Sequence, residues 1–190
     1  TSSLALLGSR GASGSAQFGR ASDQVYINAV NGNLVIQNAD EQLMGRGLGA
    51  TALRTYNSQG QFVDDNGDNW LSGSERKAWL VSGDINQPGS VTARLAADGT
   101  RTQYEWDVAQ ACYISRDGAG AHDRMMMDES ANTWIYEDGD THVKEGYSRS
   151  TGQLLWIKDS AGQSLTFTYN GAGWLSSVVT ATGETTSYEY

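Results

Sequence analysis

The 190-residue chain carries 22 acidic and 13 basic side chains, which gives a formal net charge of −9. This balance argues against a protein that holds a nucleic-acid backbone by releasing counterions. Apolar residues make up 38% of the chain, enough to bury a core, and no apolar run approaches the roughly 20 residues that span a bilayer. We therefore expect a folded, acidic protein with no nucleic-acid partner and no membrane span.

The numbers of glycine, proline and cysteine residues limit the folds that the chain can adopt. The chain has 23 glycines and one proline, a pattern that favours many tight turns over long helices. Its single cysteine, Cys112, excludes an intrachain disulfide. The chain starts at Thr1 without methionine and ends at Tyr190 inside an apparent repeat. We interpret it as a piece of a longer polypeptide, whose remainder is the first expected partner.

In chain order, the first predicted element is a flexible lead-in. Residues 1–22 are rich in Gly, Ser and Ala and offer little to bury. The runs Val25–Ile27 and Asn33–Gln37 flank the turn-forming pair Asn31-Gly32, which indicates a β-hairpin. Further strands are predicted at Ala52–Tyr56, Ala78–Val81 and Ser90–Leu95. The chain is thus divided into a lead-in (1–22), an opening segment (23–90) and a hairpin region (91–190).

The hairpin region contains an internal repeat. Residues 152–169 align with residues 173–190, with equivalent glycines and large side chains 21 positions apart. The aligned pairs are Gly152/Gly173, Leu154/Leu175, Ile157/Val178, Gly162/Gly183, Phe167/Tyr188 and Tyr169/Tyr190. Asp98-Gly99, followed by Tyr104 and Trp106, repeats the later half upstream. Each repeat combines a short strand, a glycine turn and a second strand with large residues at alternate positions, as in a β-hairpin.

The repeat predicts the architecture. One such hairpin cannot bury its aromatic face alone, so neighbouring hairpins are expected to stack sideways. The predicted fold class is all-β, with stacked antiparallel hairpins that form an extended twisted sheet and little helix. The best helical candidate, Arg124–Glu129, has three consecutive methionines but no amphipathic face.

The signature Gly-x-Leu, Asp-x-x-Gly, aromatic-x-Tyr-Asn resembles the tyrosine-aspartate (YD) repeats of Rhs and teneurin-like proteins. It is carried by Gly152, Leu154, Asp159, Gly162, Phe167, Tyr169, Asn170, Gly173 and Leu175. The succession Gly32–Val35, Gly45–Leu48 and Arg54–Ser58 is similar to the segment that opens the repeat region of bacterial Rhs proteins. Two residues depart from the pattern: Asn170 replaces the repeat's aspartate, and Thr180 stands where the next repeat would place the equivalent of Asp159.

The resemblance implies a strand-rich wrapping structure. In full-length relatives it spirals into a hollow shell around a toxic C-terminal segment, and in teneurins it forms a scaffold for cell contact. For this chain it implies a non-catalytic scaffold or shell fragment of a large secreted or cell-surface protein. An enclosed toxin segment or a surface glycan would then be a further partner. A carbohydrate- or protein-binding adhesive module is the alternative, and a glycoside hydrolase is a second one.

One acidic stretch has the spacing of a calcium loop. Asp64, Asn66 and Asp68 alternate, and Glu75 follows Asp64 by eleven positions, so their oxygen atoms could converge on one cation. Asn69 occupies the position that such loops reserve for glycine, and no flanking helices are predicted. A solvated acidic turn is therefore favoured, with no cofactor expected and calcium left open.

Catalytic residues are few. Cys112, His122 and His142 are the residues available for a Cys/His pair or a soft-metal site, and nothing in their spacing brings them together. Asp138 and Asp140, next to Glu137, are the carboxylates that could serve glycoside hydrolysis, although acidic residues beside glycine are typical of turns. We therefore expect no enzymatic activity.

Six tryptophans are many for this length, and indole rings suit both a core and a ligand-binding face. Trp106 falls on an aromatic position of the repeat, which favours burial. Trp156 and Trp174 do not fall on such positions and are the candidates for ligand binding.

Overall fold

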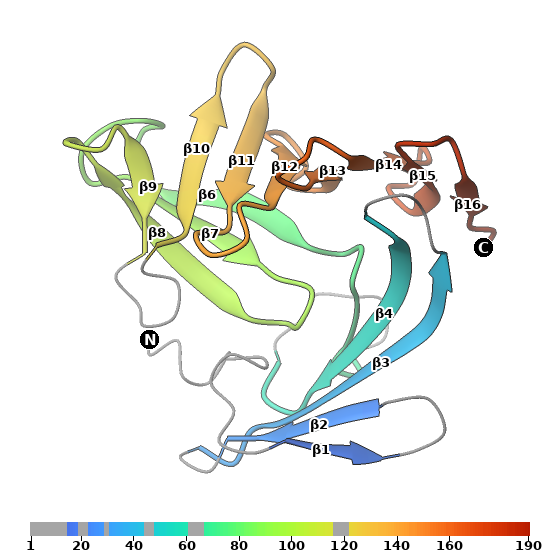
Figure 1. The fold of residues 1–190 in the computed structure, drawn as a ribbon. Coiled ribbons are helices and arrows are strands. Elements are labelled where there is room, and N and C mark those ends of the chain that lie inside the picture. The colour runs from blue at the N-terminus through green and yellow to red at the C-terminus, as the bar shows by residue number, and fades with distance from the viewer. Residues whose placement is uncertain (1–14, 19–22, 29–30, 44–47, 61–66, 116–121) are drawn as a thin grey trace. The chain divides into compact units, whose positions relative to one another are not determined.

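The computed structural model describes residues 15–18, 23–28, 31–43, 48–60, 67–115 and 122–190 (Figure 1). These residues form sixteen strands joined by turns, and none of them lies in a helix, so none lies in a helix that could cross a membrane. The predicted all-β fold of antiparallel hairpins is confirmed. The helical candidate Arg124–Glu129 is instead largely strand β10 (Arg124–Asp128), in which Met125 and Met127 are buried and Arg124 is exposed.

The chain divides into two compact units that interleave along the sequence. The first comprises Thr1–Gln42, Thr51–Arg76 and Arg94–Thr102, and the second comprises Leu43–Ala50, Lys77–Ala93 and Gln103–Tyr190. Strand β1 falls inside the predicted lead-in 1–22, at Ser15–Phe18, and the rest of that lead-in lies outside the described residues.

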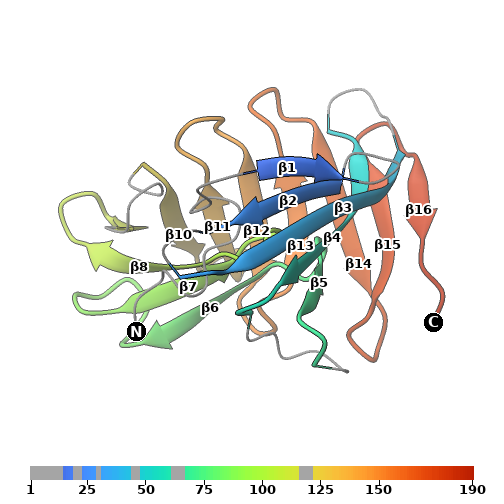
Figure 2. The ribbon, with the colours of Figure 1, turned by 90° about the horizontal axis from the view of Figure 1, so that it is seen from below.

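A five-stranded sheet belongs mostly to the first compact unit, and its strands follow the chain order (Figure 2). They are β1 (Ser15–Phe18), β2 (Asp23–Ile27), β3 (Leu34–Leu43), β4 (Ala50–Asn57) and β5 (Trp70–Ser72). The predicted hairpin at Asn31-Gly32 is confirmed: β2 and β3 pair antiparallel, with Val25 opposite Ile36. Gly32 has a φ of 71°, and its N–H donates to the Asn28 carbonyl at 2.8 Å.

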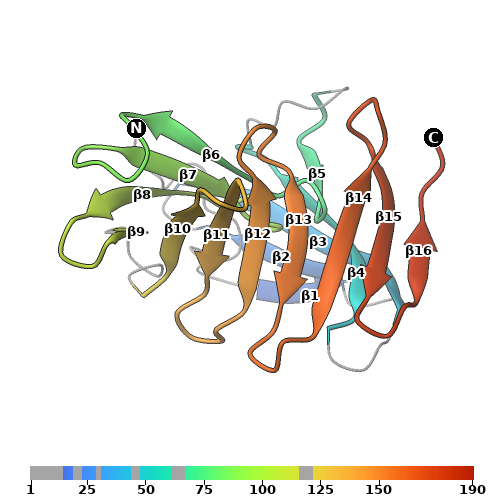
Figure 3. The same cartoon turned by 90° about the horizontal axis from the view of Figure 1, so that it is seen from above.

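The second sheet has eleven strands in uninterrupted chain order, from β6 to β16 (Figure 3). Their bounds are β6 Lys77–Ser82, β7 Val91–Leu95, β8 Arg101–Asp107, β9 Cys112–Ile114, β10 Arg124–Asp128, β11 Thr133–Glu137, β12 Lys144–Ser148, β13 Leu154–Lys158, β14 Ser164–Tyr169, β15 Leu175–Thr180 and β16 Thr185–Ser187. Each strand from β7 to β15 therefore pairs with the strand before it and the strand after it, as expected for stacked hairpins.

Alternation along these strands places large side chains on one face of the sheet, where they form the core of the second compact unit. Met127, Trp134 and Tyr147 lie opposite one another on successive strands, and all three are buried. The other buried members are Ala50, Ala78, Tyr104, Tyr113, Met125, Tyr136, Leu154, Ile157, Leu165, Leu175 and Val178.

The two C-terminal repeats adopt the same hairpin turn. The Gly162 N–H donates to the Asp159 carbonyl, and the Gly183 N–H donates to the Thr180 carbonyl, both at 3.1 Å. The Asp159 side chain accepts the Gln163 N–H at 2.8 Å, and the Thr180 hydroxyl accepts the equivalent N–H of Glu184 at 3.1 Å. Threonine thus replaces aspartate without changing the turn, because both side chains offer an oxygen acceptor at this position.

The hairpins continue upstream of the repeat that the sequence reveals. Left-handed backbone recurs at the turns, but three upstream turns place non-glycine residues there: Ala111 (φ 50°), Asn132 (φ 56°) and His142 (φ 56°). At the downstream turns Gly152 and Gly173 take this conformation, with φ of 74° and 86°. The missing glycines explain why the upstream hairpins did not align with the C-terminal ones.

The eleven-stranded sheet also folds back on itself. The first residues of β6 reach the turn between β12 and β13, where Lys77 forms a bridge with Gln153. The Ala78 N–H donates to the Gly152 carbonyl at 3.0 Å, and a Cβ on Gly152 would lie 3.0 Å from the Ala78 carbonyl oxygen. Glycine is therefore favoured at position 152 by both its backbone conformation and this close approach.

Candidate functional site

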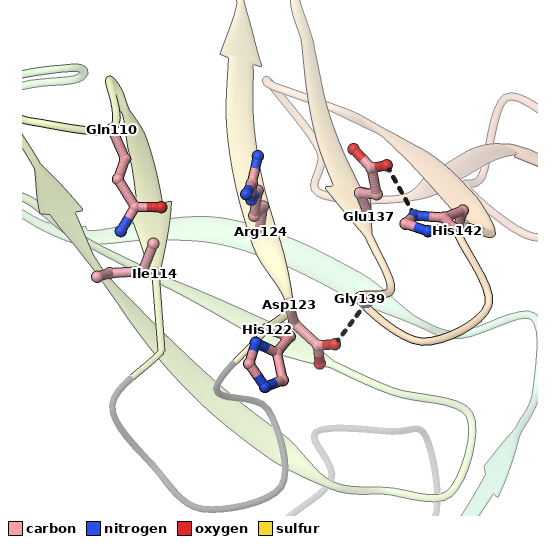
Figure 4. A pocket seen from close by; sticks show the side chains of 8 residues that line it. All are labelled: Gln110, Ile114, His122, Asp123, Arg124, Glu137, Gly139 and His142. Carbon is pink, nitrogen blue, oxygen red and sulfur yellow. Dashed lines mark hydrogen bonds and ion pairs between the residues drawn. The ribbon is translucent and has the colours of Figure 1, made fainter.

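A pocket of about 410 Å³ opens in the second compact unit, where β9 and β10 approach the turn between β11 and β12 (Figure 4). Its lining is polar and charged: Gln110, Ile114, His122, Asp123, Arg124, Glu137, Gly139 and His142. The volume lies in the range of small-molecule sites, which makes this pocket the first place to look for a function.

One wall of the pocket is a buried carboxylate that fixes the neighbouring turn. Asp123 is 4% exposed and accepts hydrogen bonds from the Tyr136 hydroxyl at 2.9 Å and the Gly139 N–H at 3.1 Å. A Cβ on Gly139 would lie 2.5 Å from the Cβ of His122, so the turn packs directly on the start of β10. The Asp123 carboxylate is thus a structural acceptor that holds the pocket's two sides together.

The other wall includes Arg124 and Glu137, which belong to a row of charges on the sheet face opposite to the core. Arg124, Glu137 and Lys144 lie opposite one another on β10, β11 and β12. Glu137 lies 3.5 Å from Nδ1 of His142 (Figure 4). Its other carboxylate oxygen lies 3.6 Å from Nζ of Lys144. His142 and Lys144 are substantially exposed, so these pairs contribute little to stability.

The carboxylates considered for hydrolysis are engaged by the fold. Asp138 Oδ1 accepts the N–H groups of Asp140 at 3.1 Å and Thr141 at 2.8 Å and the Thr141 hydroxyl at 2.9 Å. Asp140 is exposed on the same turn. Asp138 therefore caps this turn, as acidic residues beside glycine commonly do.

The pocket brings His122 and His142 together but not Cys112. The cysteine is 4% exposed and is not among the lining residues. Burial raises the pKa of its thiol; nearby Arg124 opposes this effect and Asp107 adds to it. A raised pKa disfavours the nucleophilic thiolate. Within the described ranges, no three His, Cys, Asp or Glu side chains gather into a group that could hold a metal ion.

Sequence reasoning did not bring these pocket residues together. The sequence pattern does not single out Asp123 or Arg124, and it gives no reason to pair the two histidines. One signal was available: His122 and His142 are 20 positions apart, close to the repeat length of 21, which places them at the same end of successive hairpins.

Only half of the calcium candidate lies in the described part of the chain. Asp64 and Asn66 fall outside it. Oδ1 of Asp68 accepts the Trp70 N–H at 2.8 Å, and Oε2 of Glu75 accepts the Ser72 N–H at 3.1 Å. Both carboxylates thus cap local turns, and the calcium site stays a prediction.

The two tryptophan candidates occupy different surroundings. Trp156 covers Gly146 on the neighbouring strand: a Cβ at Gly146 would lie 2.1 Å from Cε2 of the indole. Nζ of Lys158 lies 4.6 Å from the Trp156 ring centroid. Trp174 is 43% exposed, and its ring lies 5.7 Å from that of Tyr190. Trp156 therefore packs on the sheet, whereas Trp174 offers an open ring; ligand binding by either stays a prediction.

The fold and the site define a class before any comparison: an all-β protein built from consecutive hairpins, with its polar pocket made from strand ends and turns. Residues 147–185 match the family model described as RHS Repeat, a segment that begins in β12 and includes β13, β14 and β15. This part of the chain is therefore an Rhs repeat, as the C-terminal repeats predicted. The match does not include the predicted opening segment 23–90, which stays a prediction. No curated protein matches the chain.

Proposed function

We propose that this chain is a non-catalytic scaffold, one wall segment of a large secreted or cell-surface Rhs-type protein that encloses a toxin segment or presents an adhesion surface. One observation supports this proposal above the others. Eleven strands follow one another in chain order, so each hairpin is held by its sequence neighbours and the wall grows by repetition.

The polar pocket supports the same proposal. The buried carboxylate of Asp123 holds the neighbouring turn, and Glu137 is paired with Lys144. Cys112 is not among the lining residues, and the pKa of its thiol is raised. Nucleophilic catalysis requires a nucleophile within hydrogen-bond reach of its base. No such pair is present among the lining residues, so we assign the pocket no reaction.

A pair of variants in the polypeptide that carries this chain tests the proposal. Leu165 is 5% exposed in the core, whereas its neighbour Thr166 is exposed on the other face of β14. Replacing a buried leucine by alanine costs about 2–5 kcal/mol, so Leu165→Ala should loosen the wall. We expect limited proteolysis of an enclosed segment to accelerate in Leu165→Ala and to stay unchanged in the control Thr166→Ala.

Two other results would redirect the proposal. Loss of binding to cells in Trp156→Ala, with unchanged proteolysis, would favour the adhesive role over the shell. Turnover of any substrate that depends on Glu137 or His142 would contradict a non-catalytic scaffold.

A further inference from the structure

The acceptor groups of the polar pocket are used by the fold, whereas its strongest donor is free. The Asp123 carboxylate accepts a hydrogen bond at each of its two oxygens. The two oxygens of Glu137 face Nδ1 of His142 and Nζ of Lys144. Within the described ranges, the guanidinium of Arg124 has no hydrogen bond and no ion pair, although Arg124 lies opposite Glu137 in the register. The pocket therefore offers an unused positive charge with several N–H donors.

Further donors surround the same space, and they come from separate elements (Figure 4). Gln110 precedes β9, His122 precedes β10, and His142 lies in the turn between β11 and β12. Nδ1 of His142 faces Glu137, which leaves Nε2 for another partner. The side chains of Gln110 and His122 are exposed. An excess of unused donors around a cavity favours a ligand that bears a negative charge.

The backbone of His142 is a second, independent sign of a site. His142 has a φ of 56°, and the equivalent residue of the next turn is Gly152, with a φ of 74°. The two turns share one hydrogen bond: the His142 N–H donates to the Asp138 carbonyl at 3.0 Å, and the Gly152 N–H donates to the Ser148 carbonyl at 2.8 Å. Left-handed backbone suits glycine and costs histidine strain. Such strain is characteristic of binding sites.

The ion pair with Glu137 does not account for this strained histidine. The His142 side chain is 66% exposed, and ion pairs that are exposed to this degree contribute little to stability. A role in holding a ligand explains why an imidazole stands where the next turn has glycine.

We propose that this pocket binds a small organic acid through its carboxylate. The guanidinium of Arg124 takes the two carboxylate oxygens, because its planar fork matches them. Nε2 of His142 and the amide of Gln110 donate to the ligand's remaining polar atoms, and Ile114 supplies an apolar contact. This binding role goes beyond the scaffold function and does not depend on it.

The size and charge of the pocket narrow the ligand further. A volume of about 410 Å³ lies near the lower end of small-molecule sites. Asp123 and Glu137 place two negative charges in the walls, and these repel a doubly charged phosphate more strongly than a singly charged carboxylate. The geometry therefore favours a small monocarboxylate over a phosphate.

The test is a titration of the whole chain with L-lactate at neutral pH and constant ionic strength, followed by NMR signals of the His142 imidazole. Lactamide, the uncharged amide of lactate, is the matched control ligand, and inorganic phosphate is the competing anion. We expect lactate to give saturable shifts at millimolar concentration. Lactamide should give none, because it lacks the charge that pairs with Arg124.

Variants of arginine separate a built site from general charge attraction. Arg124→Gln should weaken lactate binding about tenfold or more, because it removes a charge-assisted contact. Arg124→Lys keeps the charge but not the fork, so it should restore only part of the affinity. Arg149→Gln removes the same charge from an exposed turn outside the pocket and should leave lactate binding unchanged.

The variant His142→Gly tests the strained histidine through two readouts. It should weaken lactate binding about threefold or more, measured at the Arg124 Nε–H signal, because one donor is lost. The same variant should raise the melting temperature, because glycine takes left-handed backbone without strain. Unchanged lactate affinity in His142→Gly overturns the proposal.

Three other results would also overturn it. Lactamide could bind as tightly as lactate, or Arg149→Gln could weaken lactate binding as much as Arg124→Gln does. Tighter, Arg124-dependent binding of phosphate would assign the pocket to a phosphate-bearing ligand instead. Failure of the scaffold function would appear separately, in the proteolysis of the carrying polypeptide.

Discussion

The C-terminal hairpins, β13 to β16, and the upstream hairpins, β8 to β12, share one topology but not one sequence pattern. The C-terminal turns place Gly162, Gly173 and Gly183 in left-handed backbone. Upstream turns place Ala111 and His142 there instead. The hairpin is therefore specified by alternating large side chains and by turn hydrogen bonds, and glycine lowers the strain of a turn without defining it.

The two regions also differ in their core. The upstream strands contribute packed rings: Tyr113 lies 5.7 Å from Trp134 at an interplanar angle of 74° and 5.1 Å from Trp106. The C-terminal strands contribute mainly aliphatic side chains, such as Leu165, Leu175 and Val178. Ring pairs in this edge-on geometry add to the stabilisation from burial, so the upstream region should dominate the stability of the second compact unit.

The largest expected effect tests that asymmetry. Trp134 is 1% exposed, and Trp134→Ala should lower the free energy of unfolding by about 3–5 kcal/mol, because it removes a buried ring and leaves a cavity. The matched control in the C-terminal region is Trp174→Ala, whose exposed ring should cost less than about 1 kcal/mol. Urea denaturation monitored by circular dichroism measures both. Equal losses of unfolding free energy would mean that the two regions contribute equally to stability.

The sequence predicts the hairpins wherever turn chemistry and alternation coincide. Asn31-Gly32 and the glycines of the C-terminal repeats mark their turns, and the structure confirms those hairpins. Strand β10 was not predicted because Met125, Met126 and Met127 are all apolar. In the sheet, buried and less buried methionines alternate. Sequence patterns detect alternation of polar and apolar residues, and three consecutive methionines show none.

The pocket was beyond sequence reasoning for a different reason. It depends on the packing of Gly139 against His122 and on the hydrogen bond from the Gly139 N–H to the Asp123 carboxylate, 16 positions earlier in the chain. Only the register of the sheet brings these residues into contact. Spacing indicates which residues share an end of the sheet, but it does not give the distance between them.

A reciprocal pair of turn variants should sharpen the comparison. Gly152→Ala places a side chain in left-handed backbone 3.0 Å from the Ala78 carbonyl oxygen and should cost about 1–2 kcal/mol. Ala111→Gly relieves strain at the equivalent upstream turn and should stabilise by up to about 1 kcal/mol, since part of the gain is lost to backbone entropy. Thermal unfolding measures both signs. Destabilisation by Ala111→Gly would show that alanine is accommodated there without strain.

The smallest expected effect concerns the loss of folding stability at low pH, and it compares one carboxylate from each region. The Ser130 hydroxyl, with the Ala131 N–H, lowers the pKa of Asp128 in an upstream turn. The hydroxyls of Thr180 and Thr182 lower the pKa of Glu184 in a C-terminal turn. A carboxyl whose pKa is depressed on folding contributes stability above its unfolded pKa, about 4, and that stability is lost as pH falls through the folded pKa.

Asp128→Asn and Glu184→Gln should therefore each give a shallower loss of stability on acidification, with the difference confined to pH below about 5. Urea midpoints measured from neutral pH downwards check this. Both side chains are exposed, so the changes should be small and similar in the two regions. Similar changes in the two variants would show that turn capping is local and does not depend on glycine at the left-handed position. An altered acid response in only one variant would show that capping depends on the glycine pattern of that region.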